Sequence, residues 1–191
     1  AALSVFFLVA RQAEAQSNQR LSMQLSGIAA GLQGRAYAYL APGVGGEAQL
    51  RYTIGALSFG AGLQYTRHNS ALAGATFPIA ISGPFLEPRY VLPTTLRDIG
   101  PYVSTRFSLL KQHYSLGGYE GSATGATLNG GGGALVRLTP RVNLDVGATF
   151  GFTAFRRLTI DNTETHKRTP LPAGSGTNVV VRIGLAFGLR G

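Results

Sequence analysis

Strict alternation of apolar and polar residues is the feature that most constrains what this chain can fold into. The run from Val142 to Phe152, VNLDVGATFGF, places valine, leucine, alanine and phenylalanine on one face. Asparagine, aspartate, glycine and threonine occupy the other face. Because successive side chains of a β-strand point to opposite sides, this period of two predicts strands with one apolar and one polar face.

The same period recurs along the whole chain. It marks eight segments, at residues 21–34, 46–55, 57–67, 83–93, 99–110, 124–138, 141–153 and 178–190. Most of them exceed the mean of roughly 5–6 residues for strands of globular proteins. A tilted strand needs ~9–11 residues to cross a bilayer, so the segments are long enough to span a membrane.

The connections between these segments alternate in length. Long links follow the odd segments, at 35–45, 68–82, 111–123 and 154–177, whereas short links follow the even ones, at 55–56, 94–98 and 139–140. An up-and-down barrel of the outer membrane has this asymmetry, with short periplasmic turns and longer outer loops. The sequence therefore predicts an all-β fold, an eight-stranded antiparallel up-and-down transmembrane β-barrel.

The polar faces distinguish a membrane barrel from a soluble, lipocalin-like barrel that binds a hydrophobic ligand. Charged residues form only 13% of the chain, and the polar faces carry glycine and arginine rather than lysine and glutamate. Buried charges must pair, and the planar guanidinium of arginine suits such pairs. We predict a lumen charge network made of Glu47, Arg51, Glu87, Arg89, Arg106, Arg137, Asp145 and Arg182. The interior of eight strands is only wide enough for side chains to fill, which argues against an open pore.

Aromatic residues gather near the ends of the predicted strands. Tyr52, Tyr90 and Tyr102 are examples. Tyrosine prefers the headgroup level of a bilayer, so we expect these rings in interfacial girdles.

The first residues differ in composition from the rest. The run AALSVFFLVA is apolar but too short for a membrane helix, and Ala13-Glu14-Ala15 has the small-x-small pattern of a secretory cleavage site. We expect residues 1–15 to be the remnant of an export signal and residues 16–191 to form the barrel. The net charge of +9 comes from arginines spread singly along the chain, which does not favour nucleic-acid binding.

The last predicted strand contains the pattern Arg182-x-Gly184-x-x-Phe187-x-Leu189, and residues 85–92 read FLEPRYVL. With these motifs the chain resembles the small eight-stranded outer-membrane β-barrel family, the OmpA/OmpX-type transmembrane barrel domains. The resemblance implies a monomer in the bacterial outer membrane, in contact with its lipid. It also implies that the barrel-assembly machinery recognises the terminal pattern. Members of the family serve as anchors, adhesins, binders of host factors and, in a few cases, lipid-modifying enzymes.

An enzymatic interpretation rests on His68 and Ser70. The spacing His-x-Ser, with Glu87 on the next segment, resembles the triad of outer-membrane lipid A deacylases, in which serine is the nucleophile and histidine the base. The residue after the serine is Ala71, where those enzymes have asparagine. Loop residues explain the pair equally well, so we do not expect an enzyme. The chain has no cysteine and its histidines are isolated, so neither a metal nor a cofactor is expected.

Basic residues of the predicted outer loops suggest a partner. We hypothesise that Arg156, Arg157, Lys167 and Arg168 contact the phosphates of lipopolysaccharide, since arginine forms charge-assisted bidentate bonds with such groups. The leading prediction is a closed barrel with a structural or surface-interaction role. A soluble lipocalin-like carrier and a narrow channel for small apolar solutes are the alternatives.

Overall fold

The computed structural model describes residues 20–72, 75–162, 165, 168–171 and 174–189. The predicted export signal at 1–15 lies outside these residues. In the described part, strands account for nearly all regular structure, and one short 3-10 helix accompanies them. The elements are β1 (Leu21–Gln33), η1 (Arg35–Tyr37), β2 (Gly43–Ile54), β3 (Leu57–Leu72), β4 (Ala75–Val91), β5 (Ile99–Leu116), β6 (Tyr119–Thr139), β7 (Val142–Asn162), β8 (Arg168–Leu171) and β9 (Ser175–Leu189).

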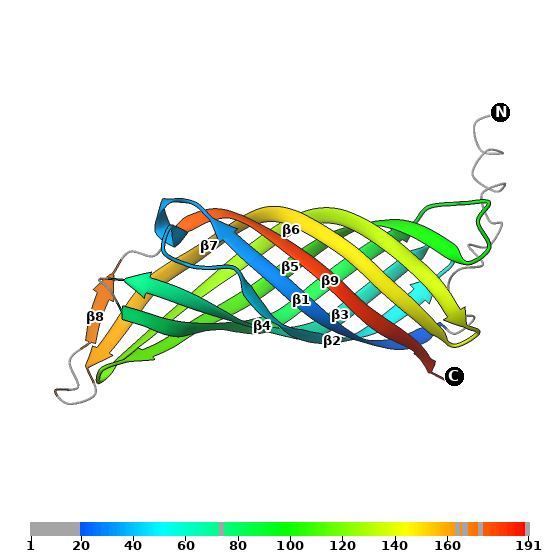
Figure 1. The fold of residues 1–191 in the computed structure, drawn as a ribbon. Coiled ribbons are helices and arrows are strands. Elements are labelled where there is room, and N and C mark those ends of the chain that lie inside the picture. Colours follow the sequence, from blue (N-terminus) through cyan, green and yellow to red (C-terminus); the bar gives the residue numbers. More distant parts are fainter. Residues whose placement is uncertain (1–19, 73–74, 163–164, 166–167, 172–173, 190–191) are drawn as a thin grey trace.

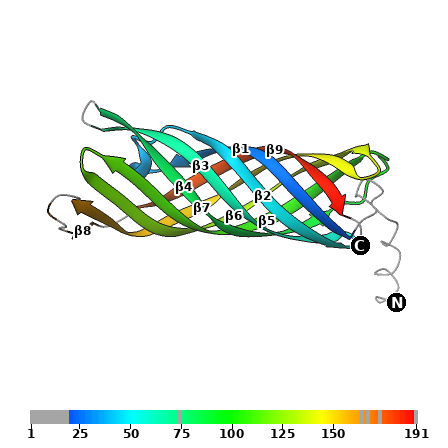
Figure 2. The same cartoon turned by 90° about the horizontal axis from the view of Figure 1, so that it is seen from below.

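Eight long strands close into an antiparallel barrel (Figure 1). The strand order is β6-β5-β4-β3-β2-β1-β9-β7, and pairing of β6 with β7 completes the ring. The short strand β8 pairs with the far end of β7, between Leu158 and Asp161. Figure 2 shows the strands inclined to the barrel axis, as closure of a sheet requires. The predicted fold class is confirmed.

The two ends of the barrel differ. Tight connections join β2 to β3 and β6 to β7 at the end where β9 finishes, whereas η1 and β8 lie at the opposite end (Figure 1). Outer-membrane barrels have their short turns on the periplasmic side. We therefore call the end where β9 finishes the inner end and the end with η1 and β8 the outer end.

The barrel is inverted relative to a soluble protein. Leu63 and Phe152 on the outside are 64% and 69% exposed, whereas Glu87 and Asp145 inside are 0% exposed. A lipocalin-like barrel would place its apolar face inward, so that alternative does not fit this chain. No helix among the described residues is long and apolar enough to cross a membrane.

The exposed apolar band has the height of a bilayer core. On β5 it extends over the outward-facing positions from Ile99 to Leu109, and the outward-facing Lys111 ends it. The ten steps from Ile99 to Leu109, at ~3.3 Å each, extend about 33 Å along the strand, or about 25 Å of height at a tilt of ~40°. Apolar bands of outer-membrane barrels are ~25 Å tall. The parts of β3 to β7 beyond this level project past the membrane.

Three of the predicted loops are wrong. Residues 68–82, 111–123 and much of 154–177 are strand, because β3 to β7 all continue beyond the membrane and pair there, and β8 pairs with the end of β7. Alternation persists in this region, although its outward side is polar. Strand β5 turns into β6 through Gly117 and Gly118, with φ of 54° and 80°. Two consecutive positive φ values are typical of a type I′ hairpin turn, which favours glycine at both positions.

Candidate functional site: the filled lumen

Glu87 of β4 is the centre of a charged layer that fills the middle of the lumen. Arg182 of β9 donates from Nη1 to Oε2 and from Nη2 to Oε1, both at 2.6 Å. Arg89 donates from Nε to Oε1 at 2.8 Å. Guanidinium nitrogens of Arg51 and Arg106 each lie 3.9 Å from Oε2. One carboxylate is thus surrounded by four guanidinium groups.

Asp145 and Glu47 compensate the remaining positive charge. Arg89 Nη2 lies 2.9 Å from Asp145 Oδ2, and Arg182 Nε lies 3.5 Å from the same oxygen. Arg106 Nη2 donates to Glu47 Oε2 at 2.5 Å. The structure brings together seven of the predicted lumen charges, which we call the charged layer: Glu47, Arg51, Glu87, Arg89, Arg106, Asp145 and Arg182.

Arg137, the eighth predicted lumen charge, lies elsewhere. It is half-buried near the inner end of β6, in register with Asn143 of β7. Its backbone N–H donates to the carbonyl of Asp98 at 2.8 Å. The alternation of β6 predicted its general direction, but the register places it below the charged layer.

Tyr102 and Gln24 belong to the charged layer, although the sequence pattern did not assign them to it. Tyr102 Oη donates to Asp145 Oδ1 at 2.6 Å and accepts from Arg182 Nη2 at 2.8 Å. Gln24 Nε2 donates to Asp145 Oδ2 at 2.6 Å. The prediction of an interfacial Tyr102 is wrong. Its position two residues before Ser104, on the lumen side of β5, was the signal that could have found it.

Glycines on the lumen face give the long side chains their room. A Cβ atom at Gly147 would lie 2.5 Å from Tyr102 Oη and 3.2 Å from Arg182 Nε. At Gly60 it would lie 2.6 Å from Arg51 Nη2. Since the interior of an eight-stranded barrel is narrow, these positions exclude a larger side chain as long as the charged layer is present.

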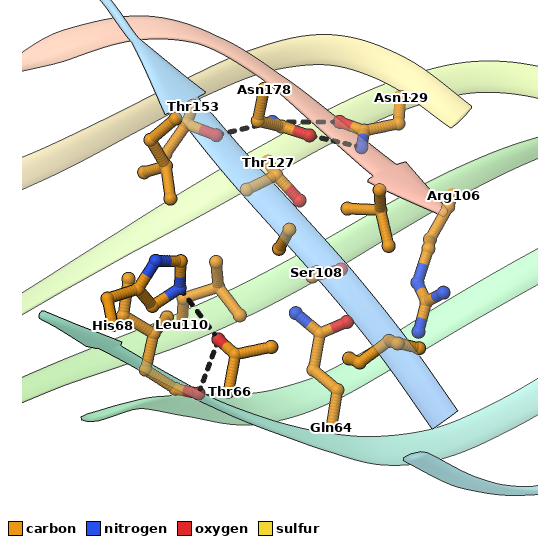
Figure 3. A pocket seen from close by; sticks show the side chains of 15 residues that line it. Gln64, Thr66, His68, Arg106, Ser108, Leu110, Thr127, Asn129, Thr153 and Asn178 are labelled. Atoms are coloured by element: carbon orange, nitrogen blue, oxygen red, sulfur yellow. Dashed lines mark hydrogen bonds between the residues drawn. The ribbon is translucent and has the colours of Figure 1, made fainter. Parts of the chain in front are cut away.

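A neutral polar layer lies on the outer side of the charged layer, and Figure 3 shows its side chains Asn129, Thr153 and Asn178 around the cavity that they line. Asn178 and Asn129 exchange amide hydrogen bonds of 3.1 Å and 2.5 Å, and Asn178 also donates to Thr153. These side chains line a cavity with about 30 Å³ of space for water, together with Arg106 and His68. Ligand pockets occupy roughly 300–1,000 Å³, so this cavity has room for water-sized molecules but not for a substrate.

The outer mouth of the lumen is closed by a buried cluster that we call the apolar cap. Its members are Tyr37, Phe77, Ile79, Ile81, Leu110, Ala123 and Phe155. Helix η1 brings Tyr37 over the mouth, where its ring lies 6.4 Å from that of Phe155 in an edge-to-face contact. Tyr37 Oη donates to the carbonyl of Gly174 at 2.9 Å, and burial raises the pKa of Tyr37 to about 12.

The structure corrects the predicted lipid-facing catalytic group. His68 faces the lumen with 1% exposure, donates from Nδ1 to the carbonyl of Ala41 at 3.1 Å, and places Nε2 3.0 Å from Thr66 Oγ1. Ser70 is also buried on the lumen side. Glu87 lies in the charged layer, bound by Arg182. A long strand β3 explains the difference, because His68 and Ser70 continue its inward-facing positions instead of entering a loop.

The other predicted site residues lie on β7, β8 and β9. In the terminal pattern, Arg182 and Gly184 face the lumen, and Phe187 pairs in register with Met23 of β1 and Val142 of β7. Arg156 is exposed on the outside of β7. Arg157 and Arg168 belong to β7 and β8, but their side chains lie outside the described part, as does the whole of Lys167.

Side chains fill the lumen in layers. Three layers lie in series along the axis: the charged layer, the neutral polar layer and the apolar cap. A second small cavity, lined by Gln24, Arg51 and Arg89 among others, lies on the inner side of the charged layer and also has about 30 Å³ for water. Among the described residues, no three potential metal ligands gather in one place.

The fold is that of the small eight-stranded outer-membrane β-barrels, and the exposed apolar band is the kind of exterior that such proteins present to lipid. Neisserial surface protein A, NspA, superposes with a TM-score of 0.66 and 18% identity, covering 88% of this chain and 97% of NspA. OprG of Pseudomonas aeruginosa gives a TM-score of 0.59 and 10% identity, covering 93% of this chain and 99% of OprG. Ail, the attachment invasion locus protein of Yersinia pestis, was solved in complex with the heparin analogue sucrose octasulfate. It superposes with a TM-score of 0.56 and 11% identity, covering 87% of this chain and 96% of Ail.

These similarities are structural. No protein-family model matches the sequence, and a comparison with curated proteins gives no match. The predicted outer-membrane barrel is confirmed at the level of the fold.

Proposed function

We propose that this chain is a monomeric, closed barrel of the bacterial outer membrane with a structural or surface-interaction role. The observation that carries the proposal is the filled lumen, in which Glu87, Asp145 and Arg106 are 0–1% exposed. Such a core anchors the barrel rigidly and leaves the outer end as the part that meets partners. A catalytic role has no support in the lumen, since the His68 ring is bound by Ala41 and Thr66 and the Glu87 carboxylate by Arg182 and Arg89.

A channel for small apolar solutes is the competing function within this fold. Solutes entering from outside would meet the apolar cap first and the charged layer next. Purified barrel in a planar bilayer should therefore give no conductance steps, and liposomes that contain it should not swell in small sugars. Regular conductance steps from folded protein would contradict the closed-barrel proposal.

We further propose that basic residues at the outer end contact lipopolysaccharide. The charged layer holds four arginines and three carboxylates, so it accounts for little of the net charge of +9. Much of the excess positive charge lies at the ends of the barrel. Arg156 is exposed at the outer end, next to Arg157 on β7. Arginine binds phosphate through charge-assisted hydrogen bonds of fixed geometry.

Binding of purified lipopolysaccharide tests this contact. Neutralising Arg156, Arg157, Lys167 and Arg168 together with glutamine should weaken binding. A matched control neutralises Arg20, Arg97 and Arg141 at the inner end, where the lipopolysaccharide leaflet is absent. Binding that is unchanged in the outer-end variant, or equally weakened in the control, would contradict the proposal.

A further inference from the structure

The outer surface of β4 to β7 contains a hollow at the level where the apolar band ends. It has a volume of about 650 Å³ and is open to the surroundings. Ligand pockets occupy roughly 300–1,000 Å³, so the hollow is large enough for part of a lipid. The two lumen cavities are much smaller, with about 30 Å³ each.

The rim of the hollow is a polar row that crosses four adjacent strands. Ser82 pairs in register with Lys111, Lys111 with Thr124, and Thr124 with Arg156. Lys111, Thr124 and Arg156 are exposed on the outside of the barrel. We call these residues the cationic row. Lys111 and Arg156 are two strands apart, about 10 Å at the backbone, so both long side chains can reach one anionic group between them.

Small residues form the floor of the hollow, one step towards the membrane centre. Leu109 pairs with Ala126, and Ala126 pairs with Ala154. Pairing between β4 and β5 is interrupted beside them at Gly83 and Pro84, since it stops at Ser82 and resumes at Phe85. Proline has no N–H to donate to a neighbouring strand. The two alanines and this interruption create the depression.

Large apolar residues continue the surface below the hollow. They are paired across the same four strands and are all exposed: Leu86, Phe107, Leu128 and Phe152. A molecule that lies along this face contacts the two cations and two hydroxyls of the cationic row first. It then contacts the hollow, and then the exposed apolar side chains. The equivalent row on β1 to β3 is Gly27, Gly46 and Tyr65, which carries no charge. The gradient is thus a property of the β4–β7 face.

We propose that this face binds one molecule of lipid A, the phosphorylated and multiply acylated glycolipid of the outer leaflet. A lipid A phosphate lies between Lys111 and Arg156, and the hydroxyls of Ser82 and Thr124 contact the phosphate or the sugar. An acyl chain lies in the hollow over Ala126 and Ala154. The charges, the hydroxyls and the apolar surface follow one another in the order in which a lipid A molecule presents its own groups.

This inference rests on the proposed lipopolysaccharide contact, because both require that the outer end of the barrel lies in the lipopolysaccharide leaflet. The residues differ: of Arg156, Arg157, Lys167 and Arg168, which form the earlier contact, only Arg156 belongs to the hollow. Lys111, Ala126 and Ala154 are new. Loss of binding to complete lipopolysaccharide in the Arg157, Lys167 and Arg168 variant would concern the loops. Binding of lipid A, which has no core saccharide, concerns the face described here.

The test is binding of hexa-acylated bis-phosphorylated lipid A to refolded barrel in detergent micelles. The double variant Lys111→Gln/Arg156→Gln should bind at least about tenfold more weakly, because it removes two charge-assisted contacts. The matched control, Arg35→Gln/Arg97→Gln, removes two exposed charges that lie away from the hollow and should bind as wild type does. Equal losses in both variants would overturn the site, because they would show unspecific attraction.

A second pair of variants tests the hollow itself. Ala154→Trp fills it from the outside of β7, whereas Ala148→Trp adds the same bulk on the same face of β7 beyond it. Only Ala154→Trp should weaken lipid A binding. Unchanged binding in Ala154→Trp would overturn the acyl position, and equal binding of phosphatidylglycerol would overturn the preference for lipid A.

Discussion

At the scale of single residues, Glu87 holds the interior of the barrel together. Its carboxylate has no exposed surface and lies against arginines from three strands besides its own: Arg51, Arg106 and Arg182. Burying charge is costly, and mutual pairing within a dense network offsets that cost. Removing one carboxylate leaves several guanidinium groups without their common partner.

Glu87→Gln should therefore destabilise the barrel strongly. The amide keeps the shape of the side chain but loses its charge, and breaking a buried pair typically costs about 3–5 kcal/mol. The measurement is urea unfolding of barrel refolded in vesicles, followed by the gel mobility of unboiled samples. The midpoint should shift to lower urea.

Glu120→Gln provides the control for this change. Glu120 is exposed near the outer turn of β6, and substitutions at such sites usually change stability by no more than about 0.5 kcal/mol. If both variants unfold at the same urea concentration as wild type, Glu87 is not the central residue of the lumen.

The sequence predicts which charges face the lumen but not which atoms pair. Alternation assigns Glu87, Arg89 and Arg182 to the interior, because each occupies an inward parity on its strand. The bidentate contact between Arg182 and Glu87 spans 95 residues of sequence and depends on barrel register, which no local pattern encodes. The position of Tyr102 was predicted wrongly because a tyrosine occurs both in the interfacial girdle of a membrane barrel and in its lumen, and the residue type alone does not distinguish them.

At the scale of the strands, the glycines of β6 decide how closely β6 and β7 approach. A Cβ atom at Gly131 would overlap the backbone of Ala148 and Thr149 on β7. Gly130, the preceding residue, faces outward, and a Cβ atom there would meet nothing within 4 Å. Gly130 therefore has room for a side chain, whereas Gly131 has none.

Gly131→Ala should lower the stability of the barrel by about 1–3 kcal/mol, the usual cost of overpacking. Gly130→Ala should leave it unchanged, because its methyl group enters lipid. Thermal unfolding of both variants, followed by loss of the folded gel band, compares them directly. Equal melting of the two variants would show that β6 and β7 can separate at no cost.

Strand β9 carries the terminal pattern, which leads to a prediction about assembly. Phe187→Ala should reduce insertion by the barrel-assembly machinery in proteoliposomes, while barrel refolded in detergent keeps its melting temperature. Leu185→Ala is the control, since Leu185 lies on the same outward face of β9 two residues earlier. Equal assembly of both variants and wild type would remove Phe187 from the signal.

Element boundaries were predictable within the membrane but not beyond it. The segment predicted at 99–110 begins where β5 begins, yet β5 continues to Leu116. Beyond the membrane the outward side turns polar, so the contrast that defines a strand from sequence disappears. The pair Gly117-Gly118 was a hairpin signal, and it would have joined β5 to β6 directly.

At the scale of the whole molecule, closure comes from layers of different chemistry in series. The inner part of the lumen is blocked by paired charges, and the outer mouth is blocked by the apolar cap, to which η1 contributes Tyr37. The sequence predicted a filled, polar interior from strand number and alternation. It did not predict an apolar outer layer, because Phe77 and Ile79 fall in a segment expected to be a loop.

The two layers lead to a prediction about permeability. Removing Glu47 and Arg106 together eliminates a charge pair without leaving either partner unpaired, and Phe77→Ala/Phe155→Ala empties part of the apolar cap. Each double variant alone should stay closed in planar bilayers, because the other layer still occludes the lumen. The quadruple variant should give small conductance steps, provided that its unboiled gel band shows a folded barrel. Conductance in the apolar-cap variant alone would mean that the charged layer passes ions, and the closure of this barrel would then depend on its outer mouth.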